Sequence, residues 1–233
     1  MPTTTPDILK VSEEDDRLAA ELGLRIPPDE CIITWNQFKE HVVGKNYIKI
    51  YDIRDDDTYF PAFTTKAHLR YSLINDTTFR SDISLRIDPI NQCAFAPGIE
   101  QRREDTDKAI FRPQPAPAVS PARVDFVVSS DPSKYIFYYF CYEEDKIRDG
   151  RCPQALIVLA VEDKREWPTG GDGVPDRQIT LNDIPLGEIG ETMIKCFSQQ
   201  FVDDTDPQME WAWKGVECAV PGSDVYNNAI MGT

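Results

Sequence analysis

Two acidic residues and a lysine in the second half of the chain have the types and spacing needed for phosphoryl chemistry. The apolar run 155–161 leads directly into Glu162, and Lys164 follows two residues later. A second apolar run begins at Val124, with Asp125 next to it. Because side chains alternate between the two faces of a strand, Glu162 and Lys164 are expected to share one face.

These three side chains suggest a metal-assisted hydrolysis. Asp125 and Glu162 are the candidate metal ligands, since carboxylate oxygens bind hard cations such as Mg²⁺ or Mn²⁺. The bound ion would activate water, and Lys164 would orient that water or stabilise the developing charge. In the alternative interpretation, Glu162 and Lys164 form an ion pair at a solvated strand end, and Asp125 is an acid that lies at a strand edge or faces a turn.

The second half of the chain reads as three strands, a helix and a final strand. The run 135–142 is apolar on both faces, which is typical of a central core strand. This order predicts an α+β fold, a mixed central β-sheet flanked by helices. The predicted strands are 124–128, 135–142, 156–162 and one within 209–220, and the helix is 186–201.

The first half has less regular patterns, and we expect residues 1–98 to form an α/β region of unknown role packed on the same domain as 99–233. Residues 100–110 are charged and compatible with a helix, and prolines follow them. The other predicted elements are helices at 12–23 and 34–43, the latter capped by Thr34, and strands at 47–53, 69–73 and 83–87.

An Asp near a strand start, then a strand ending in Glu-x-Lys, then a helix resembles the PD-(D/E)xK, or restriction-endonuclease-like, nuclease superfamily over about residues 100–220. The resemblance implies such a core in the C-terminal half and a Mg²⁺-dependent endonuclease that hydrolyses nucleic-acid phosphodiesters. It assigns Asp125, Glu162 and Lys164 to catalysis. It further implies another acid at Glu104 or Glu100, a polar Gln199 or Gln200, and a last core strand at 213–216.

The charge of the chain disfavours extended contact with nucleic acid. It has 40 acidic and 25 basic residues, a net charge of −15 and a pI of about 4.5. Non-specific nucleic-acid binding depends on Lys and Arg that neutralise phosphates. Two other functions therefore remain open, an acidic non-catalytic module that binds a basic protein and a structural, self-assembling protein.

The cysteines and the N-terminus indicate a cytoplasmic or nuclear location. The six cysteines show no C-x-x-C spacing and are expected to be reduced. No apolar run has the length of a membrane span, and residues 1–10 lack the pattern of a secretory signal. The triplet Asn75-Asp76-Thr77 fits the acceptor pattern for N-glycosylation, but it carries no weight in such a compartment.

Overall fold

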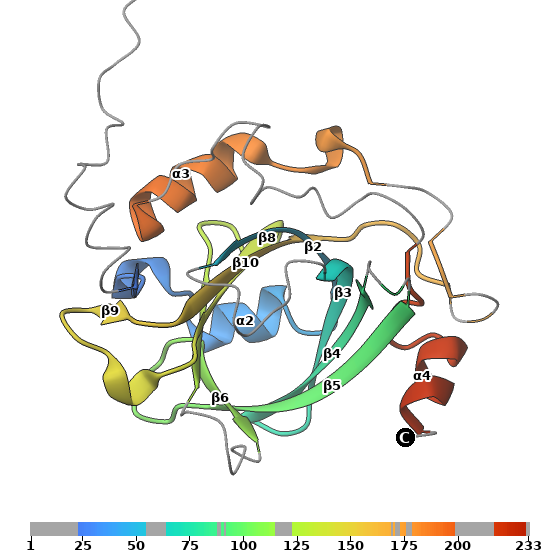
Figure 1. Ribbon diagram of the computed structural model, residues 1–233, viewed down its shortest axis with the longest axis horizontal. Coiled ribbons are helices and arrows are strands. Elements are labelled where there is room, and N and C mark those ends of the chain that lie inside the picture. The colour runs from blue at the N-terminus through green and yellow to red at the C-terminus, as the bar shows by residue number, and fades with distance from the viewer. Residues whose placement is uncertain are drawn as a thin grey trace, which may run out of the picture.

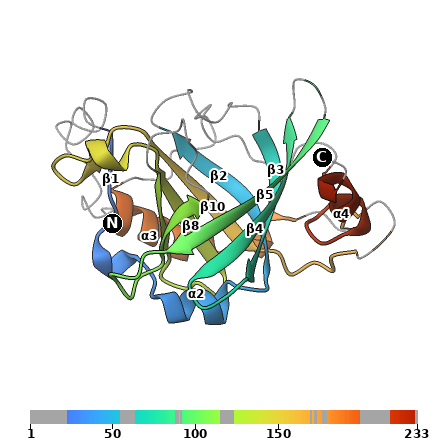
Figure 2. The ribbon, with the colours of Figure 1, turned by 90° about the horizontal axis from the view of Figure 1, so that it is seen from below.

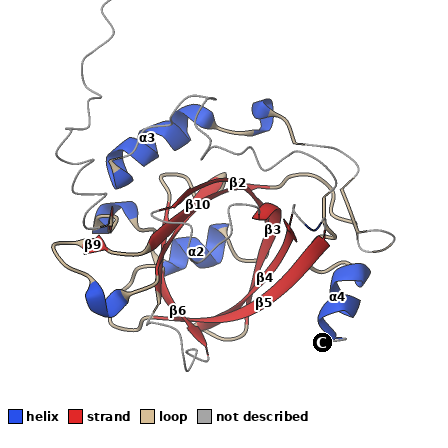
Figure 3. Ribbon diagram, viewed as in Figure 1, coloured by secondary structure: helices blue, strands red, loops and turns tan. Residues whose placement is uncertain are grey.

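The computed structural model describes residues 23–54, 64–87, 90, 92–114, 123–168, 170, 173–175, 179–198 and 217–231. Eight strands form one closed barrel, seen as a ring of arrows in Figure 1 and in red in Figure 3. Around the ring the order is β10 (Ala155–Glu162), β2 (Asn46–Arg54), β3 (Thr64–Leu73), β4 (Thr78–Ile87), β5 (Gln92–Arg102), β6 (Ile110–Gln114), β7 (Val124–Val128) and β8 (Tyr135–Cys141).

Every strand pairing in this barrel is antiparallel. The barrel closes through β10, whose Val158 lies opposite Asp52 of β2 on one side and Tyr138 of β8 on the other. The prediction of an α+β fold with a mixed sheet and a restriction-endonuclease-like core is therefore wrong. The predicted boundary between residues 98 and 99 falls inside β5, and both sides of it contribute strands to the same barrel.

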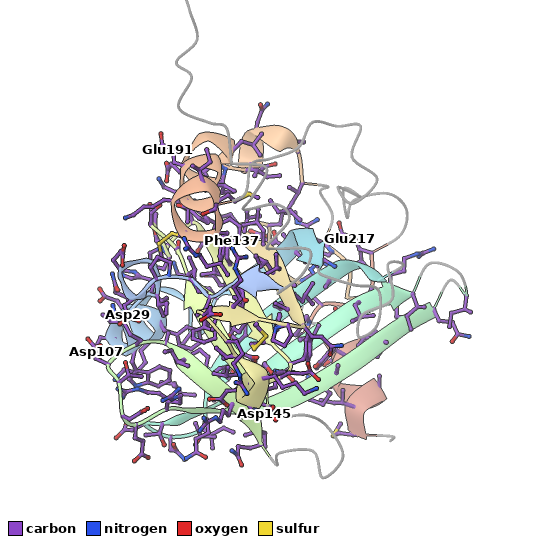
Figure 4. The ribbon with its side chains drawn as sticks, turned by 60° about the vertical axis from the view of Figure 1, so that its left-hand side comes forward. Asp29, Asp107, Phe137, Asp145, Glu191 and Glu217 are labelled. Carbon is purple, nitrogen blue, oxygen red and sulfur yellow. A yellow bond between two sulfur atoms is a disulfide. The ribbon has the colours of Figure 1, made fainter. Side chains whose placement is uncertain are left out.

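The apolar strands that suggested an α+β fold are buried on both faces for a different reason. Nearly every residue of β7, β8 and β10 is buried. Their inner faces point into the barrel, and helix α3 (Leu186–Phe197) covers their outer faces (Figures 1 and 4). The ring of Phe197 on α3 lies 5.2 Å from the ring of Phe137 and 6.3 Å from that of Tyr139. Double burial in this chain comes from a covering helix, not from a parallel sheet.

Helix α2 (Trp35–His41) lies across one end of the barrel (Figure 2). Thr34 caps it, as predicted, and Gln37 completes the capping box. Two aromatic residues of α2 enter the barrel interior and pack there against strand residues. The contacts, between ring centroids, are Trp35 with Phe111 at 5.8 Å, and Phe38 with Phe79 at 5.1 Å and Phe111 at 5.0 Å.

All six cysteines form disulfides, so the prediction of reduced cysteines is wrong. Cys31–Cys196 fastens α3 to the segment before α2, and its two residues are 165 positions apart in the chain. Pairings over such distances cannot be deduced from spacing alone. The other two are Cys93–Cys218, between β5 and the segment preceding helix α4 (Asp224–Met231), and Cys141–Cys152, between β8 and the short strand β9 (Arg151–Cys152).

The other strands and helices predicted within the described residues are confirmed, except for residues 100–110. Residues 100–110, predicted as helix-compatible, contain the end of β5, a turn and the first residue of β6. The helix predicted at 12–23 and the strand at 209–220 lie almost wholly outside the described residues, as do Gln199, Gln200 and residues 213–216. The remaining short elements are β1 (Leu24–Arg25), which pairs with β9, and the 3-10 turns Asp29–Cys31, Glu144–Lys146 and Leu181–Asp183.

Candidate binding site

The structure separates the two carboxylates that were expected to share a metal ion. Asp125 lies on β7 opposite Phe140 of β8, and Phe140 lies opposite Leu156 of β10. Glu162 is six residues further along β10, which corresponds to about 20 Å at the usual rise per residue. Asp125 and Glu162 therefore do not converge on one ion.

Glu162 and Lys164 form the surface ion pair of the alternative interpretation. Glu162 lies 3.8 Å from Nζ of Lys164, whose side chain is 72% exposed, and 3.3 Å from Nζ of Lys45. Glu104 is exposed in the turn between β5 and β6. Within the described part of the chain, no three His, Cys, Asp or Glu side chains gather as metal ligands. The binding of Mg²⁺ or Mn²⁺ stays an untested prediction.

Asp125 instead belongs to a charged cluster inside the barrel, formed with Arg123 and Glu100. Arg123 and Asp125 are two residues apart, so strand alternation directs both side chains to the same inner face. Arg123 donates from Nε to Asp125 Oδ1 at 2.8 Å and from Nη2 to Asp125 Oδ2 at 2.6 Å. Its Nη2 also donates to Glu100 Oε1 at 2.9 Å, which joins β5 to β7 across β6. We call these three residues the inner cluster.

Aromatic side chains surround the inner cluster. The guanidinium of Arg123 lies 5.2 Å from the centre of the Phe140 ring. The rings of Tyr71 and Tyr138 are buried and stack on each other with centroids 5.6 Å apart. Burial first, with the nearby carboxylates adding to it, raises the pKa of both phenols, so both hydroxyls stay neutral and can donate hydrogen bonds.

The inner cluster has two carboxylates and one cation, and Glu100 is the group left short of partners. Its Oε2 is buried and has no hydrogen-bond partner among the described residues. Burial, followed by the charge of Asp125, raises the pKa of Glu100 to about 8 although Arg123 acts to lower it. Burial also raises the pKa of Asp125 to about 6. Because Arg123 contacts both oxygens of Asp125, we place the proton on Glu100 at neutral pH.

The acidic surface contrasts with this interior site. Asp29, Asp107 and Asp145 are exposed, and Figure 4 labels them on the outside of the molecule.

The sequence interpretation named Glu100 only as an alternative to Glu104 in a predicted helix, and it gave Arg123 no functional role. The spacing Arg123-x-Asp125 at the start of a strand was the available signal, because it places opposite charges on one face.

The known proteins that are similar to this chain are solved structures, and their similarity concerns the fold. No protein-family model and no curated protein matches the chain. A solved biogenic amine-binding protein has 8% identity, with 87% of this chain and 94% of that chain covered and a TM-score of 0.52. The cockroach allergen Per a 4 has 12% identity, coverage of 74% and 93%, and a TM-score of 0.44. A bovine odorant-binding protein has 13% identity, coverage of 53% and 72%, and a TM-score of 0.35.

The chain has a lipocalin-like fold. This rests on the closed eight-stranded barrel together with the amine-binding protein of TM-score 0.52. The predicted resemblance to PD-(D/E)xK nucleases and the predicted nuclease function are therefore wrong, since the barrel has no such core and separates the expected site. The two alternatives, an acidic protein-binding module and a self-assembling protein, gain no support. None of the helices in the described ranges is long and apolar enough to span a membrane.

Proposed function

We propose that the barrel binds a small molecule in its interior and that this ligand carries a positively charged amine beside an apolar or aromatic group. The observation that carries the proposal is the Glu100 carboxylate, buried with Oε2 unpartnered among the described residues. A buried carboxylate is retained at low cost only when it is protonated or paired. An amine would provide both the positive charge and the hydrogen-bond donor that Oε2 lacks.

The charge balance of the inner cluster favours a cation over an anion. Arg123 already contacts Asp125 and Glu100, so one positive charge faces two carboxylates. A cationic ligand would balance the cluster when Glu100 loses its proton. An anionic ligand would instead place a negative charge close to Asp125, whose guanidinium partner Arg123 is already paired, and like charges in a buried site repel strongly.

The surroundings suit an amine attached to a small ring or alkyl chain. The interior of an eight-stranded barrel is either filled by side chains or holds one small ligand, and we propose the second for this protein. Phe79 lies opposite Glu100 on the neighbouring strand, and aromatic faces attract cations. Because α2 covers one end of the barrel, we propose entry from the other, past Arg123, whose side chain is 25% exposed. The amine-binding protein above shares only its fold with this chain, so the proposal depends on Glu100.

The test is calorimetric titration with two probes of similar size and opposite charge, 2-phenylethylamine and 3-phenylpropanoate. We expect the amine to bind and the carboxylate not to. The Glu100→Gln variant should weaken amine binding about tenfold to a hundredfold, because a hydrogen bond to a charged group contributes about 1.5–3 kcal/mol. Glu191→Gln, on the exposed face of α3 in Figure 4, is the matched control and should leave affinity unchanged. Tighter binding of the carboxylate would contradict the proposal.

We also propose that the protein functions in an oxidising compartment, in place of the cytoplasm or nucleus expected from the sequence. Three disulfides support this, since such bonds persist in secreted proteins and are rare in the cytosol. A thiol-alkylating reagent should label no cysteine before reduction and all six after it. Labelling of native protein isolated without reductant would contradict the proposal.

A further inference from the structure

We infer that Asn75 is an N-glycosylation site and that its glycan covers the apolar surface formed by Leu73 and Ile74. The pattern Asn-x-Ser/Thr, in which x is not proline, occurs once in the 233-residue sequence, at Asn75-Asp76-Thr77. Such a glycan is bulky and solubilising, and the folded protein must leave room for it at the surface.

The local geometry leaves the amide nitrogen of Asn75 accessible. Asn75 is exposed in the turn between β3 and β4. Its Oδ1 accepts hydrogen bonds from the backbone N–H of Thr77 and of Thr78, both at 2.9 Å, and from the hydroxyl of Thr77 at 3.3 Å. Because Oδ1 faces the turn, Nδ2 lies on the other side of the amide group and faces away from it.

Two large apolar side chains directly before this turn are exposed. Leu73 is 43% exposed and Ile74 is 54% exposed. Leu73 ends β3 and Ile74 directly precedes Asn75, so both exposed side chains lie within two residues of the acceptor and within reach of an attached sugar chain. A glycan at Asn75 would therefore shield the adjoining patch from other molecules.

The position of the turn keeps the glycan away from the proposed ligand entrance. Trp35 on α2 donates from Nε1 to the carbonyl of Asp76 at 3.1 Å. The N–H of Arg102 donates to the carbonyl of Thr77 at 2.8 Å. The acceptor is thus fixed at the barrel end that α2 covers, opposite the end where Arg123 is exposed. Modification here is compatible with ligand binding.

The covalent step requires a donor that the secretory pathway supplies, a lipid-pyrophosphate-linked oligosaccharide. Nδ2 of Asn75 attacks C1 of the first sugar, forming the N–C1 bond while the bond from C1 to the phosphate oxygen breaks. The lipid pyrophosphate leaves with the bonding electron pair, and the proton lost by the amide nitrogen passes to the leaving pyrophosphate or to water. The inference rests on the proposed oxidising compartment and is independent of the ligand proposed for the barrel.

The test is secretion of the chain from insect cells behind an added signal peptide, followed by intact mass measurement. We expect the mass to fall on treatment with peptide N-glycosidase, which converts Asn75 to Asp. Asn75→Gln and Thr77→Ala should be secreted without the sugar, whereas Thr77→Ser, which preserves the acceptor pattern, should retain it. A disulfide-bonded wild-type chain secreted at its unmodified mass would overturn the inference while leaving the compartment proposal intact.

The covering role has a separate readout. Enzymatic removal of the sugar from folded wild-type protein should increase the fluorescence of a dye that binds exposed apolar surface. The same treatment of a Leu73→Ser, Ile74→Ser variant should not. Equal dye fluorescence with and without the sugar in the wild type would overturn the covering role.

Discussion

Two buried clusters of this protein use the same residue types and reach opposite electrostatic states. Each consists of one arginine held between two carboxylates, and in each the arginine and its Asp are two residues apart in sequence. One is the inner cluster and the other, which we call the outer cluster, lies against the outer face of β3. Their members are Glu100, Arg123 and Asp125 inside the barrel, and Asp163, Arg165 and Glu217 outside it.

The outer cluster satisfies its carboxylates. Asp163 accepts from Arg165 Nε at 2.8 Å and from Trp167 Nε1 at 2.9 Å. Glu217, labelled in Figure 4, accepts from Arg165 Nη1 at 2.8 Å and lies 3.0 Å from Nε2 of the buried His68. Burial alone would raise the pKa of Glu217, but its interactions with His68 and Arg165 outweigh burial and lower the pKa to about 2.

The inner cluster lacks those additional donors. Glu100 receives one hydrogen bond from Arg123, its Oε2 has no partner within the described ranges, and its pKa is raised to about 8. The residue types are the same in both clusters, so the outcome depends on how well donors offset burial. At Glu217 the donors His68 and Arg165 outweigh burial. At Glu100, burial and the charge of Asp125 outweigh Arg123. The outer cluster is complete as it stands and serves stability, whereas the inner cluster is completed by a proton or by a cationic ligand.

The largest expected effect comes from breaking the outer cluster. Arg165→Met should lower the free energy of unfolding by about 3–5 kcal/mol, because it leaves two buried carboxylates without their cation. Urea denaturation measures this. Arg103→Met is the control, since Arg103 pairs with exposed Asp105 and such surface pairs contribute little to stability. Equal losses for the two variants would show that the outer cluster has no structural role.

A matched pair of Glu→Gln changes sharpens the comparison at pH 8. Glu217→Gln should reduce stability by about 1–3 kcal/mol, because charge-assisted hydrogen bonds weaken. Glu100→Gln should be neutral or stabilising in the ligand-free protein, because it removes a buried charge that is only partly compensated. The same denaturation experiment ranks the two variants, and the reverse order would contradict our assignment of roles.

The smallest expected effect is the change in the free energy of unfolding with pH. The pKa of Glu100 is raised from 4.5 to about 8 on folding. Its stabilising contribution is therefore fully present below pH 4.5 and is lost as pH rises through 8. For Glu217, whose pKa is lowered to about 2, the contribution is present above pH 4.5 and is lost as pH falls towards 2.

Between pH 5 and pH 8, Glu100→Gln should therefore gain stability relative to wild type, by at most about 1.4 kcal/mol per pH unit. Denaturation curves of both proteins at several pH values measure this difference. A difference that stays constant over the whole range would show that Glu100 does not titrate there.

Local patterns predicted the individual elements well, because strands and capped helices depend on neighbouring residues. The strands at 124–128, 135–142 and 156–162 and the Thr34 cap are examples. Closure of the barrel could not be predicted from such local patterns. It pairs Ile157 with Ile53, about a hundred residues earlier, and no local signal encodes that contact. Continuous apolar strands were taken for a sheet between helices, whereas here the barrel interior replaces one helical layer.

The site was only partly predictable for a related reason. Asp125 was singled out as a metal-binding acid at the start of a strand, whereas its partners in the structure come from the fold. Glu100 reaches it from β5 across β6, and strand pairing decides which face points inward. The Glu162–Lys164 pair led to the wrong prediction of a catalytic site. Charged residues are common where a strand ends at the protein surface, whether or not they have a catalytic role. The disulfides Cys31–Cys196 and Cys93–Cys218 were missed because each joins distant segments that only the fold brings together.

The most direct test of the role of Glu100 is the number of protons released when 2-phenylethylamine binds at pH 7. Calorimetry in two buffers of different ionisation enthalpy gives this number. Because the pKa of Glu100 is about 8 and the amine is already protonated, we predict release of about one proton per amine in the wild type and none in Glu100→Gln. Amine binding without proton release, at an affinity that Glu100→Gln leaves unchanged, would contradict the account.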